Sequence, residues 1–327
     1  MRKYGFNMQW MFEHHGQPAK APDLKELDFI AKRGFNFIRV PLDYKFWTRD
    51  FDYLAIDESV TDQIDSYLAA CSERGLHMCL NMHRAPGFCT NHNHREKHSL
   101  WTDDEAQRGF VHIWSFFAKK FKGVPSDKLS FNLLNEPPAI GKYGLTRDNH
   151  EAIMRATIKA IRDIDPQREI VLDGIDCKYV MPELADTGAI QSGRGYEPFT
   201  VSHYKAEWLD FEYDWPEPAY PCTLNGVYWD RKALLDFYQP WKDLESQGVR
   251  VHIGEFGCYN KTPSDVALAW QKDLLSVYRE LEFGYALWNF KGTYGVVEHN
   301  KPGAKYELID GFQVDRALLE ALMDNRV

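Results

Sequence analysis

The 327-residue sequence has no run of apolar residues that could cross a bilayer, which takes about 18 consecutive apolar positions. It also has no lysine- or arginine-rich run, and its 48 acidic residues outnumber 39 basic ones, for a net charge of −9. Nucleic-acid-binding proteins usually carry a basic patch that displaces counterions from phosphates. These absences argue against a membrane or nucleic-acid partner, so the expected partner is small or uncharged.

Cysteine is scarce, with six residues and no CxxC pair. Scattered cysteines within apolar runs are typical of buried thiols in a reducing compartment rather than of a disulfide framework. Near the N-terminus, Asn7, Gln9 and Glu13 interrupt any signal-peptide core. We therefore expect a cytoplasmic protein, or a secreted one if a leader was removed.

The sequence also lacks a Pro-, Gly- or Ser-rich linker, a low-complexity tract and a short internal repeat, so one domain is expected over residues 1–327. Short apolar runs alternate instead with longer amphipathic segments, which is typical of repeated β/α units. Strands are predicted at Tyr4–Met11, Asn36–Pro41, Leu76–His83, Leu129–Glu136, Glu169–Asp173, Phe199–Tyr204, Arg250–Glu255 and Gly284–Phe290. Helices are predicted at Asp23–Lys32, Glu58–Arg74, Asp103–Lys122, Asp148–Asp165, Pro182–Thr187, Arg231–Ser246, Pro263–Glu282 and Val314–Met323.

Eight such units form either a closed barrel or an open doubly wound sheet. A nucleotide-binding open sheet normally has a glycine-rich loop after its first strand, whereas this chain reads Phe12-Glu13-His14-His15-Gly16 there. The prediction is a single (β/α)8 TIM barrel. An extended aromatic-rich loop, at 205–228, follows the predicted sixth strand and is long enough to cover a binding cleft.

Active sites of such barrels form at the C-terminal ends of the strands, and polar or aromatic residues end most of the predicted strands here. These residues are Arg39, His83, Asn135, Glu136, His203, Tyr204, Glu255 and Trp288. Glu136 and Glu255 would face each other from the fourth and seventh strands. Each residue alone could be structural, but burying them all at one end without a use would cost several kcal/mol of desolvation.

Two facing glutamates suit the cleavage of a glycosidic bond. One carboxyl protonates the leaving oxygen while the other stabilises or attacks the positive centre at the sugar carbon. Different environments can separate the two pKa values, so that one group is protonated and the other ionised near neutral pH. A nearby cation such as Arg39 would favour the ionised form, and hydrogen bonds would fix its orientation.

Several of these motifs resemble glycoside hydrolase family five, the cellulase family, in the clan of (β/α)8 retaining glycosidases. They are RGFNFIRVP, the NEP within LLNEPP, His203, GEFG at 254–257, and ALWNF. The resemblance implies double displacement with retention of configuration, Glu136 being the general acid/base and Glu255 the nucleophile. It implies no cofactor and no metal.

The same resemblance implies roles for the neighbours. Arg39 would bond the nucleophile, Asn135 would contact the sugar 2-hydroxyl, His83 and His203 would support the substrate and the acid/base, and Trp288 would form the sugar platform. A non-proline cis peptide is implied after Trp288.

One position departs from the family pattern. The family has His-x-Tyr at the end of the sixth strand, with the tyrosine on the nucleophile, whereas the predicted strand ends in His203-Tyr204-Lys205. We expect Tyr204 to take that role through a local shift. The alternative is that Lys205 reaches into the cleft and alters specificity.

The sequence does not assign a single role to two groups of residues. Trp47, Trp101, Trp208 and Trp215 fall in loops and could either stack on sugars or pack against the barrel. His92, His94 and His98 lie in one segment near Cys89, but their spacing matches no metal-ligand template, so contact with substrate is favoured over a metal.

The expected substrate is a β-1,4-linked glucan or a related oligo- or polysaccharide. Two alternatives within the enzyme class are a β-mannosidase or mannanase, and an exo-acting glycosidase on short oligosaccharides, which closure of the cleft by the aromatic loop would favour. A non-catalytic carbohydrate-binding barrel is a further alternative, against which the intact Glu136 and Glu255 argue.

Overall fold

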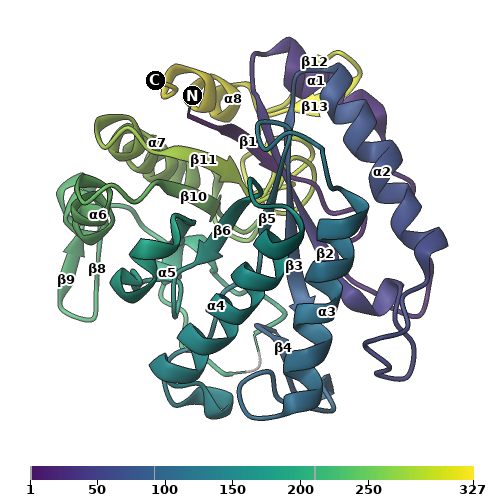
Figure 1. Cartoon of the computed structure of the whole chain (residues 1–327). Coiled ribbons are helices and arrows are strands. Elements are labelled where there is room, and N and C mark those ends of the chain that lie inside the picture. The colour runs from purple at the N-terminus through teal and green to yellow at the C-terminus, as the bar shows by residue number, and fades with distance from the viewer. Residues whose placement is uncertain (1, 92, 210) are drawn as a thin grey trace.

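The computed structural model describes residues 2–91, 93–209 and 211–327. In these ranges eight parallel strands close into a barrel with helices around it (Figure 1). The strands pair in the order β2-β1-β11-β10-β7-β6-β5-β3, and a further β2–β3 pairing closes the ring. Their bounds are β1 Tyr4–Asn7, β2 Phe37–Asp43, β3 His77–Ala85, β5 Leu129–Asn132, β6 Glu169–Asp173, β7 Ile190–Gly195, β10 Val251–Phe256 and β11 Gly284–Leu287. The predicted TIM barrel is confirmed.

Helices cover the outside of the barrel, and their ends follow local sequence signals. Asp23 caps the first helix by accepting a hydrogen bond from the backbone N–H of Lys25, and Thr146 forms a reciprocal capping box with Asn149. The long helices are α1 Leu24–Lys32, α2 Glu58–Glu73, α3 Asp104–Lys120, α4 Arg147–Ile164, α6 Arg231–Ser246, α7 Ser264–Glu280 and α8 Arg316–Asp324. A short 3-10 helix, η4 Pro182–Thr187, connects β6 to β7. None of the described helices is long and apolar enough to span a membrane.

The predicted sixth strand is wrong. Residues 199–202 form the short helix α5 (Phe199–Ser202), and the strand in that place of the barrel is β7, at Ile190–Gly195. Its sequence, IQSGRG, contains a single large apolar residue, so it lacks the hydrophobic signal of a buried strand. It is a strand because β6 and β10 pair with it on its two sides.

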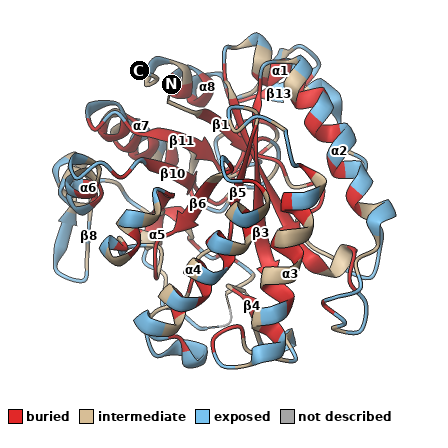
Figure 2. Cartoon of the chain, in the orientation of Figure 1, coloured by how far each residue is buried: buried red, intermediate tan, exposed pale blue. Residues whose placement is uncertain are grey.

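The core lies inside the barrel and between the strands and the helices, where Figure 2 shows the strands as buried. Trp114, Trp241 and Trp270 are fully buried there. Trp47 and Trp101 are also buried, with only 1% and 2% of their surfaces exposed. These two tryptophans, whose role the sequence left open, therefore pack in the core.

Smaller elements decorate the loops. In the aromatic segment, β8 (Cys222–Leu224) and β9 (Val227–Trp229) form an antiparallel hairpin beside α6 (Figure 1). The strands β12 (Glu307–Ile309) and β13 (Phe312–Val314) form another hairpin, and β4 (Phe88–Cys89) pairs with the end of β3. Besides η4, the described residues form the 3-10 helices η1 Tyr44–Phe46, η2 Asn93–Arg95 and η3 Lys142–Gly144.

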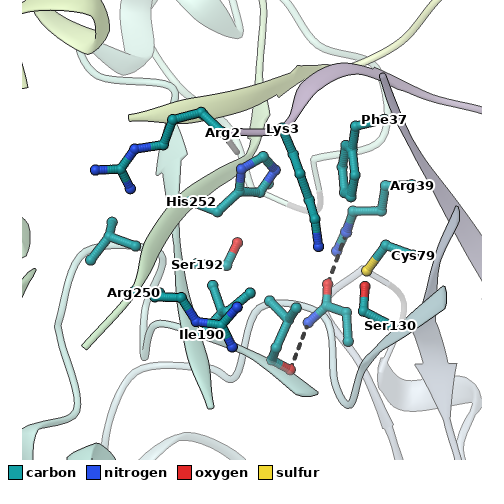
Figure 3. Close-up of a pocket in the computed structure, with 15 residues that line it drawn as sticks. Arg2, Lys3, Phe37, Arg39, Cys79, Ser130, Ile190, Ser192, Arg250 and His252 are labelled. Carbon is teal, nitrogen blue, oxygen red and sulfur yellow. Dashed lines mark hydrogen bonds between the residues drawn. The ribbon is translucent and has the colours of Figure 1, made fainter. Parts of the chain in front are cut away.

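The N-terminal end of the barrel holds a cavity of about 80 Å³ (Figure 3). Lys3, Arg250 and His252 line it. Lys3 and Arg250 both bind the carboxylate of Glu169, so each of these two cations has an anionic partner. Arg39 also lines this cavity, whereas His83, Glu136, His203, Glu255 and Trp288 line a cleft at the opposite end of the barrel.

Candidate active site

A cleft of about 560 Å³ opens at the C-terminal ends of the barrel strands. Glu136 and Glu255 both line it, together with His83, His203 and Trp288. Arg39 and Asn135 are almost fully buried and hydrogen-bond to residues of the cleft. The structure therefore brings seven of the eight predicted site residues together, the exception being Tyr204.

Glu255 lies near the end of β10 and is held at both carboxylate oxygens. Its Oε1 accepts a hydrogen bond from Arg39 Nη1, and its Oε2 accepts one from the Tyr196 hydroxyl at 2.9 Å. Burial and the negative charge of Glu255 raise the pKa of Tyr196 well above its ordinary value, so this hydroxyl keeps its proton and donates it. The carboxylate is thus oriented by one cation and one neutral donor.

Glu136 follows β5 and occupies an unusual backbone conformation, with φ at +45°. Such a conformation costs a non-glycine residue of order 1–3 kcal/mol and persists where the surroundings fix it. Here the backbone N–H of Glu136 donates to Asp173 Oδ2 at 3.2 Å, and its side-chain Oε1 accepts from Arg194 Nε at 2.8 Å. Burial, and then the charge of Glu255, raise the pKa of Glu136 to about 7, against the opposing charge of Arg194. Glu136 can therefore hold a proton near neutral pH.

Arg39 links Glu255 to residues of the neighbouring strands. All five of its N–H groups have acceptors, so its guanidinium has one fixed orientation. Nε donates to Asn132 Oδ1 at 2.8 Å, Nη1 to Asn7 Oδ1 at 3.0 Å and to Glu255 Oε1, and Nη2 to Asn135 Oδ1 at 2.8 Å and to Asp173 Oδ2 at 3.4 Å.

The expected contact between Tyr204 and Glu255 is wrong. The Tyr204 hydroxyl lies 3.4 Å from Glu217 Oε1, and the tyrosine on Glu255 is Tyr196. The alternative for Lys205 also fails, because its ammonium lies 4.7 Å from the centre of the Tyr204 ring and Lys205 is not among the described residues that line the cleft. Both errors follow from the misplaced sixth strand.

Sequence reasoning missed three residues: Arg194 and Tyr196 at the end of β7, and Asp173 at the end of β6. A signal for two of them exists in Arg194-Gly195-Tyr196, which keeps the x-Tyr spacing of the family pattern with arginine in the place of histidine. Asp173 is the last residue of β6, whose observed bounds are those predicted. An acidic residue at the C-terminal end of a barrel strand was the available sign that Asp173 belongs to the site.

The family model for Cellulase (glycosyl hydrolase family 5) matches residues 1–293. The chain belongs to glycoside hydrolase family 5. Among its relatives is Endoglucanase C of Acetivibrio thermocellus, 27% identical over 295 residues, which are 82% of this chain and 83% of that protein. Another is Cellodextrinase A of Ruminococcus flavefaciens, 25% identical over 277 residues, 80% of this chain and 75% of that protein.

Solved structures agree with this membership. A crystal structure described as a glycoside hydrolase is 55% identical, covers 100% of both chains and superposes with a TM-score of 0.98. Thermotoga maritima Cel5A in complex with mannotriose has the same fold, with a TM-score of 0.77 at 22% identity over 98% of this chain and 97% of that one. The protein is accordingly a glycosidase, with Glu136 and Glu255 at the cleft of its barrel.

In this glycosidase His83 contacts both the hydrogen-bonded residues around Glu255 and the aromatic ring of Trp288. Asn135 Oδ1 accepts from both Arg39 and Arg194, which turns Asn135 Nδ2 toward His83 Nε2 at 3.3 Å. On its other side, His83 Nδ1 lies 3.1 Å from Asn81 Oδ1. Burial, and then the charges of nearby arginines, hold the pKa of His83 well below its usual range. His83 is therefore a neutral imidazole with its proton on Nδ1.

Aromatic rings form the walls of the cleft. Trp288 stacks on His83 with ring centres 5.2 Å apart, and the peptide bond that follows Trp288 is cis, as expected. Trp208 also lines the cleft and packs against Tyr259. Trp215 instead stacks on Phe199 and is not among the described cleft residues. Further lining residues on the Trp208 side are Tyr196, His203 and Tyr294, and burial lowers the pKa of His203 to about 3.

The histidine-containing segment after β3 reaches the cleft through Asn91 and Arg95. His98 lies away from it, with Nδ1 3.0 Å from the Tyr53 hydroxyl and Nε2 3.5 Å from Glu105. His92 lies outside the described residues. Within the described ranges, no group of three His, Cys, Asp or Glu side chains could hold a metal ion.

Proposed function

We propose that the protein hydrolyses β-1,4-linked glucan chains and their oligosaccharides with retention of anomeric configuration. The observation that carries this proposal is the pair of differently held glutamates at one cleft. Glu255 is bound by Arg39 and Tyr196, whereas burial raises the pKa of Glu136 to about 7. One group is thus arranged to attack and the other to donate a proton.

In the first step, a carboxylate oxygen of Glu255 forms a bond to the anomeric carbon. The bond between that carbon and the glycosidic oxygen breaks, and the proton of Glu136 moves to the leaving oxygen. Trp288 and the stacked His83 would support the ring of the sugar that is attacked. The products of this step are a glycosyl-enzyme ester and a shortened chain with a free hydroxyl.

In the second step, the carboxylate of Glu136 takes a proton from a water molecule. The water oxygen bonds to the anomeric carbon, and the ester bond to Glu255 breaks. Two inversions restore the original configuration, and Glu136 is again protonated.

The choice of glucan rests on relatives named endoglucanase and cellodextrinase. Cel5A of Thermotoga maritima has been solved with both cellobiose and mannotriose, so a β-mannan substrate is the second candidate. The same carboxyl pair would act on either sugar, because the two differ only in the orientation of one hydroxyl group.

Product analysis on cello- and manno-oligosaccharides tests this proposal. With cellotetraose, proton NMR should show the β-anomer first, and chromatography should show cuts within the chain. Release of single units from one end would make the protein an exo-glycosidase, and a first-formed α-anomer would refute retention.

The two glutamate roles have a separate test. Glu255→Ala should lose nearly all turnover, and added azide should restore it with formation of the α-glycosyl azide. Glu136→Ala should keep activity on substrates whose leaving group needs no proton. Equal loss on all substrates would contradict the acid role of Glu136.

We also propose a cytoplasmic location, where the protein would act on imported or soluble oligosaccharides. The support is that all six cysteines are free, four of them buried. Fractionation of the native cells tests it, and recovery of the protein from the medium would overturn it.

A further inference from the structure

We propose that Arg194 is a positioning residue that keeps the catalytic proton of Glu136 on its Oε2 atom, facing the substrate. This inference rests on the proposed function, since it concerns how the acid of that reaction is oriented. Arg194 is only 2% exposed and lies at the end of β7, next to both glutamates.

The guanidinium of Arg194 has one fixed orientation because all five of its N–H groups have acceptors. Nη1 donates to Ser192 Oγ and to the Gly193 carbonyl, each at 3.1 Å, and Nη2 donates to Asn135 Oδ1 at 3.0 Å and to Asp173 Oδ2. Nε donates the fifth bond, to Glu136 Oε1 at 2.8 Å. Four contacts therefore anchor the group, and the fifth is directed at Glu136.

This fifth contact distinguishes the two oxygens of Glu136. An N–H that points at Oε1 requires that oxygen to be an acceptor, so a proton on the same atom would oppose it. Within the described residues, Oε2 has no hydrogen-bond partner, and Glu136 lines the cleft. When Glu136 is neutral, its proton therefore sits on Oε2.

The same contact serves both steps of the reaction. In the first step Oε2 gives its proton to the glycosidic oxygen, and in the second step Oε2 takes a proton from water. Oε1 remains an acceptor for Arg194 throughout, so the carboxyl group need not rotate between the steps. Pre-set donors of this kind cost no reorganisation at the moment of reaction.

The buried charges of the site agree with a proton on Glu136. Arg39 and Arg194 carry two positive charges, and Asp173 and Glu255 carry two negative ones, with contacts between both signs. The cluster is neutral when Glu136 is protonated. Asp173 completes the arrangement because one of its oxygens accepts from Arg194 and from the backbone N–H of Glu136.

Arg194→Lys tests the inference, since lysine keeps the charge but replaces the planar fork by one ammonium group. The readout is kcat/KM for aryl β-cellobiosides whose leaving groups span a wide range of pKa. General acid catalysis contributes about 10²–10⁴-fold. We expect a loss of about 100-fold on cellotetraose and on poor leaving groups, and less than about threefold on the dinitrophenyl substrate.

The matched control is Arg168→Lys. Arg168 is equally buried, but it binds the carbonyls of Phe121, Val124 and Leu129 near the start of β5. This variant should lower the melting temperature and leave the dependence on the leaving group unchanged. Should Arg194→Lys fail to fold, Ser192→Ala removes one anchor of Arg194 without a change of charge. It should make kcat/KM depend more steeply on the pKa of the leaving group, as expected for Arg194→Lys, but by a smaller amount.

An equal loss on good and poor leaving groups, or no loss on either, would overturn the inference and show that Arg194 acts only on the fold. A wild-type protein that hydrolyses no aryl cellobioside would instead refute the proposed function. The two failures are therefore distinguishable within one set of substrates.

Discussion

Tyr196→Phe removes a single hydroxyl from the site and tests which tyrosine holds Glu255, the proposed nucleophile. The hydroxyl donates to Glu255 Oε2 at 2.9 Å, and at the cleft Glu255 is buried and Tyr196 half-buried. A hydrogen bond to a charged group is worth about 1.5–3 kcal/mol, which corresponds to about 10–150-fold in rate. Arg39 still binds the other oxygen of Glu255, so we expect a loss near the lower end of that range.

The assay is kcat/KM on dinitrophenyl β-cellobioside, because departure of that leaving group needs no proton from Glu136 and the rate then reports on Glu255. Tyr204→Phe is the matched control. Its hydroxyl lies 3.4 Å from Glu217 Oε1, and we expect less than about a threefold change. An unchanged rate for Tyr196→Phe, or an equal loss for Tyr204→Phe, would refute the assignment of Tyr196.

Three further predictions rest on the pKa values of two groups shifted by burial and on the close packing around Gly195. Because the pKa of Glu136 is raised to about 7, kcat/KM should fall above that pH for substrates whose leaving group must be protonated. The dinitrophenyl substrate needs no such proton, so its kcat/KM should not fall over the same pH range. Burial lowers the pKa of Lys301 from 10.5 to about 8. Between these two pH values the unfolded chain binds more protons than the folded one, so the free energy of unfolding of the wild type should rise with pH across that interval. Lys301→Met should flatten this rise and stabilise the protein at pH 7 by at most about 3 kcal/mol in urea unfolding; a destabilised variant would contradict the reasoning. Gly195→Ala should destabilise by at least about 2 kcal/mol, because its new methyl would overlap Tyr278 Oη and Phe256 Cβ, and an unchanged melting temperature would show that the strand can shift.

The sequence alone determined the barrel and most of the cleft. Seven of the eight predicted strands overlap observed ones, because their apolar runs are local signals that survive in any context. His83, Glu136, Glu255 and Trp288 could be placed at the cleft because each lies near the end of such a run or follows it, whereas Arg39 lies in the middle of β2 and reaches Glu255 with its long side chain. Parallel strands of a barrel bring these ends to one mouth, so linear position was enough to predict proximity.

Only the tertiary structure decided where the sixth strand lies and which residues orient the two glutamates. The segment Ile190–Gly195 is polar and glycine-rich, and its extended form depends on ladders to β6 and β10, which are distant in sequence. Because the observed strand lies at Ile190–Gly195 and not at the predicted Phe199–Tyr204, the tyrosine that contacts Glu255 is Tyr196, and Arg194 contacts Glu136. The Arg194-Gly195-Tyr196 spacing marks two of these residues, but it gains meaning only once the strand beneath it is known. The hydrogen bonds that make this segment a strand join parts of the chain that are far apart in sequence, so they leave no pattern in one short window.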